Sequence, residues 1–305
     1  MENHLDLIRN FLDESAALGE KAVLVVCGPT ASGKTALSLD LAETFNGEII
    51  SADSAQVYRG MDIGTAKITA EEQARVRHHL IDVRNPDESF TMADFRREGT
   101  AAIEDILERG KLPILCGGTG LYLDSIVENY QMPVAPPIPE LRAKLEAEAL
   151  QHGVEFVHEK LAALDPEKAR LIHPNNLRYV IRAIEIFEHT KGLVVGGKGK
   201  PAYRVFKIGI DWPREVLYDR INRRVAAQIQ EGLLTEIKGL LDLGFSPELQ
   251  SMQALGYKEL VPYVLGEKPL SECLDTLKQS TRNYAKRQLT WFRKDKNIHW
   301  INHAS

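Results

Sequence analysis

Residues 28–35 read GPTASGKT and combine glycines with a lysine and a hydroxyl side chain in a fixed spacing. The stretch fits the pattern G-x-x-x-x-G-K-[ST] at every fixed position. In this pattern the backbone N–H groups enclose linked phosphates, the lysine contacts the outer phosphate and the hydroxyl binds Mg²⁺. We therefore expect a phosphate-binding loop in which Lys34 and Thr35 have these two roles, with Mg²⁺ as the cofactor.

The residues on either side are those that such a loop requires. Residues 22–26, AVLVV, predict a buried strand, and residues 36–45, ALSLDLAETF, have helical spacing. The N–H groups of 31–35 would then converge at the start of a helix, where the partial positive charge favours a diphosphate. An ordinary Gly-rich turn between a strand and a helix is the alternative, and both flanks favour the phosphate loop.

Strand and helix patterns alternate over residues 22–125. Further strands are predicted at 47–53, 78–83 and 112–118, and a helix at 91–109. This alternation indicates an α/β fold in which helices cover both faces of a parallel sheet. In such folds ligands bind at the carboxyl ends of the strands, which is where the phosphate loop would lie.

The pattern changes after the fourth predicted strand. Residues 132–139 contain four prolines and predict a stiff connector, and 140–190 are helical in spacing. A Gly-rich link at 192–201 leads back to a strand at 203–210. We expect a helical insertion that acts as a lid or a second binding wall. The predicted domains are 1–131 with 201–305, and 132–200.

The composition describes a soluble globular chain of 305 residues, 44% hydrophobic and 27% charged. No apolar run approaches the roughly 18 residues that cross a bilayer. Residues 1–21 are acidic and amphipathic, unlike a signal peptide. The three cysteines lie far apart and lack metal-ligand spacing. We expect a cytoplasmic protein that does not contact membranes.

Charge is distributed unevenly. The formal net charge of −5 argues against broad, non-specific affinity for nucleic acids. Residues 278–296 nevertheless hold seven lysines and arginines and a single acid, Asp295, with aromatic residues between them. A local basic site is therefore compatible with the acidic total.

Asp53 ends the predicted second strand, at the same edge of the sheet as the phosphate loop. A carboxylate there can take a proton from an amine as a general base, or can bind Mg²⁺ directly or through water. Position alone leaves both roles open. A small-molecule kinase with a helical lid and a GTPase-like RNA-binding switch are two classes that use such a loop. The chain has no guanine-reading N-K-x-D motif, which disfavours the second.

Four further motifs extend over most of the chain: 50–67, ISADSAQVYRGMDIGTAK; 117–126, GGTGLYLDSI; 251–259, SMQALGYKE; and 286–293, KRQLTWFR. With the phosphate loop, they occur in the order found in the bacterial tRNA dimethylallyltransferases, which this chain closely resembles. One departure lies at Arg178 and Tyr179, where that family usually has a Gln-Arg pair. The resemblance implies a fold like that of P-loop NTPases, a parallel sheet flanked by helices, with an inserted all-helical domain.

The resemblance also implies the reaction. A dimethylallyl group passes from dimethylallyl diphosphate to the exocyclic N6 amine of the adenosine 3′-adjacent to the tRNA anticodon, and pyrophosphate leaves. Asp53 is then the general base, and Thr119, Lys34 and Arg224 are the other catalytic residues. Diphosphate binding is assigned to one run of residues and one arginine: Gly28, Pro29, Thr30, Ala31, Ser32, Gly33, Lys34, Thr35 and Arg220. Which of the neighbouring arginines contacts the diphosphate stays open, Arg223 included, with a solvated helix face as the alternative.

The expected macromolecular partner is tRNA, bound through its anticodon stem-loop to a monomeric enzyme. The residues assigned to tRNA lie in three segments: Asp53, Ser54, Ala55, Gln56 and Thr119; Arg142, Arg178 and Arg182; and Arg282, Lys286, Gln288, Trp291 and Arg293. Stacking on aromatic rings together with phosphate contacts is how single-stranded RNA loops are held. In the alternative the cations are solvated and the two rings pack in the core, Phe292 more deeply than Trp291.

Overall fold

The computed structural model describes residues 2–131, 133, 135–192 and 196–303, which form two compact units. The first consists of Met1–Asn129 with Lys200–Ser305, and the second of Tyr130–Gly199. The connector and the link expected around the insertion each include residues outside the described ranges, at 132, 134 and 193–195. Each unit has its own hydrophobic core.

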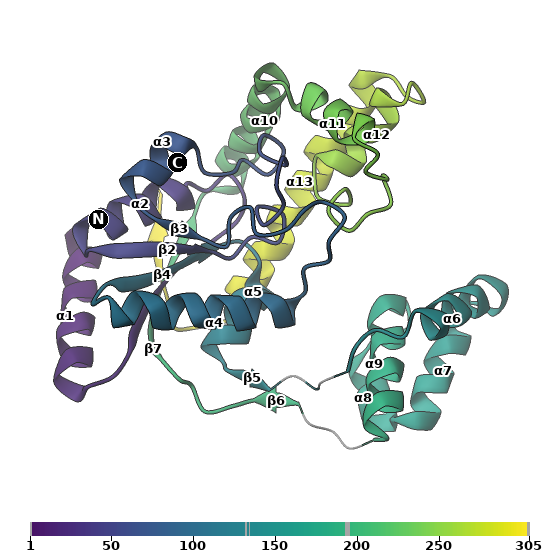
Figure 1. Ribbon diagram of the computed structural model, residues 1–305, viewed down its shortest axis with the longest axis horizontal. Helices are drawn as coiled ribbons and strands as arrows, with labels where there is room; N and C mark the ends of the chain where they lie inside the picture. The colour runs from purple at the N-terminus through teal and green to yellow at the C-terminus, as the bar shows by residue number, and fades with distance from the viewer. Residues whose placement is uncertain (1, 132, 134, 193–195, 304–305) are drawn as a thin grey trace. The chain divides into compact units, whose positions relative to one another are not determined.

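A sheet forms the centre of the first unit (Figure 1). It has six strands in the order β3-β2-β4-β1-β7-β8. Its strands are β1 (Ala22–Cys27), β2 (Gly47–Ser51), β3 (His78–His79), β4 (Leu112–Gly117), β7 (Arg204–Asp211) and β8 (Ile298–Asn302). Every pair of neighbouring strands in it is parallel. The predicted α/β fold with a parallel sheet is therefore confirmed.

Strand β1 is buried on both faces of the sheet, as the apolar run AVLVV predicts. Val23 and Val25 pack in one core cluster, and Leu24 and Val26 pack in the other. This alternation follows from the period of two along a strand. Because β1 is covered on both faces, its position in the sheet is fixed. Its carboxyl end leads directly into the phosphate loop at Gly28.

Helices cover each face of the sheet. Side chains of α1 (Glu2–Leu18) and α2 (Lys34–Thr44) contribute to the cluster on one face. The cluster on the other face includes side chains of α4 (Met92–Glu108), α5 (Gly120–Val127), α10 (Arg214–Glu231), α11 (Leu233–Asp242), α12 (Tyr257–Val264) and α13 (Leu270–Phe292). The short helix α3 (Ala70–Arg75) begins at a capping box formed by Thr69 and Glu72. Within the described ranges, no helix has the length and apolar character that a bilayer crossing requires.

The second unit is built mainly from four helices. They are α6 (Pro139–His152), α7 (Val154–Leu164), α8 (Pro166–Leu171) and α9 (Leu177–Thr190), accompanied by the antiparallel pair β5 (Tyr130–Gln131) and β6 (Gly197–Lys198). Leu145, Val157, Leu161, Val180 and Ile181 form the centre of a separate core. Each helix therefore buries an apolar stripe against its neighbours within this unit.

Candidate active site

Three loops meet at the carboxyl ends of β1, β2 and β4. The Ala52 N–H donates to Cys116 O at 2.8 Å, and the Thr119 N–H donates to Ala52 O at 3.3 Å. A Cβ on Gly117 would lie 2.1 Å from Ala52 O, so only glycine permits this approach. The residues Asp53 and Thr119 are thereby brought to neighbouring positions, as the sequence predicts.

The phosphate loop has the backbone that its glycines require. Gly28 and Gly33 have φ angles of 146° and 102°, and Ala31 has a φ of 61°. Helix α2 begins at Lys34, and no side chain caps its first turn. The free N–H groups of a helix start, together with its partial positive charge, suit an anion. The loop therefore has the form of a phosphate site.

Lys34 is held against its own loop, where its Nζ donates to Pro29 O at 2.7 Å. Burial lowers the pKa of Lys34, while the nearby charge of Asp53 acts in the opposite direction. Thr35 is exposed on the first turn of α2. An ammonium and a hydroxyl are thus available beside the N–H groups of the loop.

Asp53 lies among cationic and aromatic groups. Its Oδ1 accepts the Ala55 N–H at 2.9 Å. Burial lowers the pKa of the Arg224 guanidinium, and the charge of Asp53 counteracts this effect. Burial also raises the pKa of Tyr284 to about 12, and the charge of Asp53 acts in the same direction. Asp53, Lys34, Arg224 and Tyr284 therefore share one electrostatic environment.

Two hydroxyls at this edge are buried without a hydrogen-bond partner in the described part of the chain. They are Ser32 Oγ in the phosphate loop and Thr119 Oγ1 after β4. A buried polar group that stays unpaired costs about 1–3 kcal/mol. Such atoms in a site suggest a ligand that supplies the missing partner. Both were predicted as site residues.

Three of the four arginines of α10, Arg220, Arg223 and Arg224, have different surroundings. Arg220 Nε donates to Ala31 O at 2.8 Å, so its guanidinium lies against the phosphate loop. Arg224 donates to Thr65 O at 3.4 Å. Burial lowers the pKa of its guanidinium, and the nearby charge of Asp53 acts in the opposite direction. Arg223 is exposed and pairs with Asp219 on its own helix. The geometry favours Arg220 and Arg224 over Arg223 as diphosphate ligands.

The loop after β2 contains the residues expected to recognise the base. Ser54 is exposed. The Gln56 amide is used within the protein, because its Oε1 accepts from Ser51 Oγ at 2.9 Å and its Nε2 donates to Ala66 O at 3.2 Å. A base could bond to Gln56 only by exchanging one of these bonds. Ser54 is the freer of the two side chains.

The buried position of Gln288 does not fit its assignment to tRNA, which requires a side chain exposed to RNA. Its side chain is buried, with Oε1 accepting the Thr30 N–H at 2.8 Å and Nε2 donating to Gly118 O at 2.9 Å. The amide therefore joins the phosphate loop to the loop after β4. Because both of its polar ends are engaged, Gln288 braces the site instead of offering a surface to RNA.

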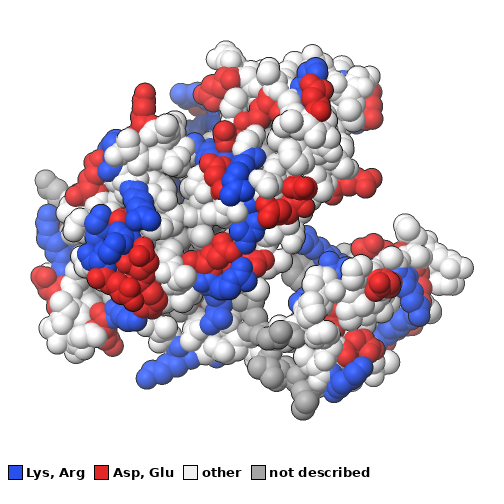
Figure 2. Space-filling model, in the orientation of Figure 1, with Lys and Arg blue, Asp and Glu red and all other residues white. Residues whose placement is uncertain are grey.

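The other C-terminal residues assigned to tRNA lie along α13 and just after it. Trp291 is 39% exposed and its Nε1 donates to Asp124 at 2.9 Å, whereas Phe292 is 4% exposed, so Phe292 is the more buried ring as predicted. Arg293 donates to Asp211 at 2.8 Å. Arg282 packs over the Tyr218 ring, and Lys286 is exposed. Lysine and arginine are mixed with acids on the face shown in Figure 2.

The insertion arginines divide into two kinds. Arg142 Nε and Arg182 Nη1 donate to the buried carboxylate of Glu185 at 2.6 and 3.2 Å. Burial by itself would raise the pKa of Glu185, but the bonds from Arg142, the Ile138 N–H and Arg182 lower it to about 2. Arg178 is exposed. The assignment of Arg142 and Arg182 to RNA thus overlooked a structural role, whereas Arg178 is available for contact.

The different surroundings of Arg142 and Arg178 predict different effects of their replacement on stability. We expect Arg142→Ala to lower the free energy of unfolding of the helical unit by about 1–3 kcal/mol, because it removes charge-assisted bonds to a buried carboxylate. Since the pKa of Glu185 is depressed, this contribution is present at pH 7 and is lost as the pH falls from about 4.5 towards 2. Urea unfolding and hydrogen exchange over α6–α9 measure it. Arg178→Ala is the control and should leave stability unchanged.

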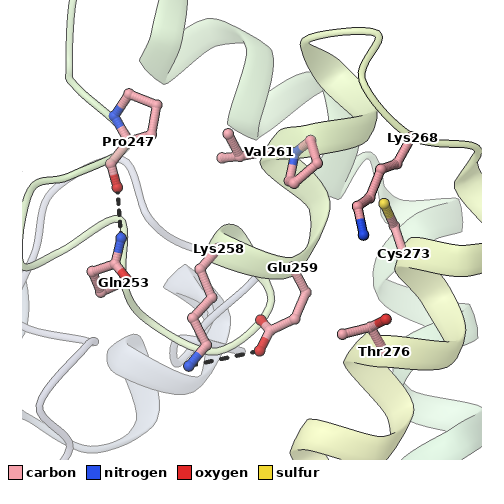
Figure 3. Close-up of a pocket in the computed structure, with 9 residues that line it drawn as sticks. Pro247, Gln253, Lys258, Glu259, Val261, Lys268, Cys273 and Thr276 are labelled. Atoms are coloured by element: carbon pink, nitrogen blue, oxygen red, sulfur yellow. Dashed lines mark hydrogen bonds and ion pairs between the residues drawn. The ribbon is translucent and has the colours of Figure 1, made fainter.

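A cavity of about 530 Å³ lies away from this edge, between α12 and α13 and the loop before α12 (Figure 3). Its walls include Val261, Cys273 and two lysines. Lys268 pairs with Glu272 at 2.5 Å, and Lys258 lies 3.8 Å from Glu259. None of the predicted site residues lines this cavity.

The fold and the site together define a class. A parallel α/β sheet with a phosphate loop, an acid at the carboxyl end of another strand of the same sheet and two arginines beside them is typical of a phosphate-binding transferase or kinase site. A family model described as IPP transferase matches residues 56–295. The chain belongs to the IPP transferase family.

Relatives extend this membership over nearly the whole chain. A tRNA dimethylallyltransferase of Alkaliphilus oremlandii is 51% identical over 288 residues, 93% of this chain and 92% of its own. One of Halalkalibacterium halodurans is 50% identical, covering 93% and 91% of the two chains. The crystal structure of a full-length tRNA isopentenylpyrophosphate transferase from Bacillus halodurans matches with a TM-score of 0.70 at 49% identity, over 93% and 90%.

A second solved structure reaches beyond bacteria. It is a eukaryotic dimethylallyltransferase described as acting on tRNA, with a TM-score of 0.76 at 30% identity, over 92% of this chain and 74% of that one. The family that the motifs resembled is thus the family to which the chain belongs.

Proposed function

We propose that this protein transfers a dimethylallyl group from dimethylallyl diphosphate to the N6 amine of the adenosine 3′-adjacent to the anticodon of tRNA. The names of its relatives support the reaction. The observation that carries it is the gathering of Asp53, Lys34 and Arg224 at one sheet edge beside the phosphate loop. An acid next to a diphosphate site is what this transfer needs.

The residues suggest how the transfer proceeds. The allylic C–O bond breaks, a new C–N bond forms to the N6 nitrogen, and pyrophosphate leaves with the electron pair. The negative charge that develops on the diphosphate is stabilised by the loop N–H groups, Lys34 and Arg224, as preorganised donors do. Asp53 accepts the proton that the amine loses. We assign the Thr119 hydroxyl, which is buried without a hydrogen-bond partner in the described part of the chain, a bond to the reacting amine.

We propose Mg²⁺ as the cofactor, held mainly by the phosphates of the enzyme's substrate. Within the described ranges no group of three or more His, Cys, Asp and Glu side chains could hold a metal. Mg²⁺ commonly uses one or two protein ligands together with water and substrate phosphates. The exposed Thr35 hydroxyl would be its protein ligand, and the bound ion would neutralise charge on the diphosphate.

Binding of tRNA would involve the exposed face of α13 and the helical insertion, with Lys286, Trp291 and Arg178 as accessible contacts. We propose a monomer that acts in the cytoplasm. The test is to mix the protein with radiolabelled dimethylallyl diphosphate and bulk tRNA, without ATP, and to count acid-precipitable label. Label in tRNA supports the proposal. Label in free adenine nucleotides, or ATP turnover without RNA labelling, would replace it by nucleotide prenylation or by a kinase.

The exposed cation on α13 gives a prediction about RNA binding. Contacts with phosphates release counterions, so the logarithm of the affinity falls linearly with the logarithm of salt concentration. We expect Lys286→Ala to flatten this slope for an anticodon stem-loop by about one unit. Fluorescence titrations at several salt concentrations measure it. Lys238→Ala, on α11 and paired with Asp242, is the control. An unchanged slope for Lys286→Ala would mean that this face of α13 is only solvated.

A further inference from the structure

Two consecutive carbonyl groups of the phosphate loop bond to side chains from distant parts of the chain. Arg220 Nε donates to Ala31 O at 2.8 Å, and the indole Nε1–H of Trp212 donates to Ser32 O at 2.8 Å. Trp212 directly follows β7, the strand that pairs with β1. The proposed reaction assigns no role to this tryptophan.

The indole ring of Trp212 is itself held in place. The His303 imidazole stacks on it with ring centroids 3.8 Å apart and planes 6° from parallel. The Arg220 guanidinium carbon lies 4.6 Å from the ring centroid. The backbone N–H of Trp212 donates to Asp211 Oδ1 at 3.0 Å. An aromatic ring with these contacts has little freedom to turn, so its N–H is fixed in direction.

The bond to Ser32 O fixes one peptide plane of the loop. In a trans peptide the C=O and N–H groups point in opposite directions, so holding Ser32 O outward turns the Gly33 N–H inward. Among the residues that the structure describes, the Gly33 N–H has no hydrogen-bond partner. Gly33 has a φ of 102°, and glycine adopts positive and negative φ about equally readily, so a contact from outside the loop helps to select this conformation.

We propose that Trp212 is a positioning residue of the phosphate loop, which aims the Gly33 N–H at the diphosphate by binding Ser32 O. This inference rests on the proposed binding of a diphosphate at the loop. Trp212 does not touch the ligand and acts through the backbone. Its loss affects binding of the diphosphate, whereas binding of RNA is unaffected.

The test replaces the indole by a ring without a donor. Trp212→Phe keeps a six-membered aromatic ring for stacking and removes the N–H together with the five-membered ring of the indole, the same loss that the control variant below undergoes. We expect it to weaken the binding of inorganic pyrophosphate, measured by calorimetry, about 3- to 10-fold, the effect of one hydrogen bond. The KM for dimethylallyl diphosphate rises by the same factor, and the Kd for an anticodon stem-loop stays unchanged. Trp300→Phe, in β8 against Gly209, is the control and leaves pyrophosphate binding as it was.

The outcomes separate the two proposals. If the wild-type protein does not bind pyrophosphate, the proposed function at this loop is wrong and the inference falls with it. If the wild type binds and a folded Trp212→Phe variant binds equally well, only the role of Trp212 is wrong. If the Trp212→Phe variant does not fold, a measurement on the wild type tests the same role. On adding pyrophosphate, solvent exchange of the Trp212 indole N–H should slow while that of Trp300 does not, and equal behaviour of the two would overturn the role.

Discussion

Replacing Asp53 by asparagine is expected to lower the single-turnover rate of dimethylallyl transfer by roughly 10²–10⁴. Asparagine has the same shape, and its Oδ1 can still accept the Ala55 N–H that holds the loop in place. It cannot accept the proton of the amine. The variant should therefore fold, bind dimethylallyl diphosphate and bind tRNA as the wild type does. Rapid-quench measurements at saturating donor and RNA isolate the chemical step.

The control for Asp53 is an acid on the same unit that faces solvent. Asp40→Asn, on the exposed side of α2, removes one negative charge without touching the sheet edge and should leave the rate unchanged. A single-turnover rate for Asp53→Asn within a few-fold of the wild type would remove Asp53 as the base.

Local patterns predicted the elements that carry the site. The buried run at 22–26, the phosphate-loop motif and the helix after it correspond to β1, the loop and α2. These features depend on residues that are neighbours in the chain, where strand burial, glycine conformation and helix spacing act over a few positions. The family motifs added the roles that local patterns left open.

Strand ends were predicted less well. The third strand was expected at 78–83 but β3 contains only His78 and His79. The chain leaves the extended conformation there, because Leu80 and Asp82 have φ angles of 62° and 55°. The second strand was expected to reach 53 and ends at Ser51. The strand β8, at Ile298–Asn302, was not predicted, since five residues at the end of a helical segment give a weak pattern.

The roles of several polar side chains depend on partners far away in the sequence. Gln288 bonds to the Thr30 N–H across 258 positions, and Trp212 bonds to Ser32 O across 180. Arg142 finds Glu185 on another helix. Residue type alone cannot distinguish a solvated cation or a free amide from one that is already paired, so the partners of these side chains were not predicted.

The second large effect is expected at the lysine of the phosphate loop. Lys34→Ala should reduce dimethylallyl transfer by about 10²–10³, because it removes a preorganised donor to the charge that develops on the leaving diphosphate. In the free protein Nζ is bonded to Pro29 O, so its movement to the ligand exchanges one hydrogen bond for a charge-assisted one. The burial that lowers the pKa of Lys34 also makes this interaction stronger, since little water screens it.

The measurement must separate donor chemistry from RNA binding. Single-turnover rates and pyrophosphate affinity should both fall for Lys34→Ala, whereas the Kd for the anticodon stem-loop should stay close to that of the wild type, because the loop serves the diphosphate. Lys238→Ala, on the exposed side of α11, loses the same charge away from the loop and should change none of the three. Transfer by a folded Lys34→Ala variant at the wild-type rate would show that the leaving diphosphate is stabilised elsewhere. Loss of RNA binding alone would instead place the nucleic acid, and not the donor, at residues 28–35.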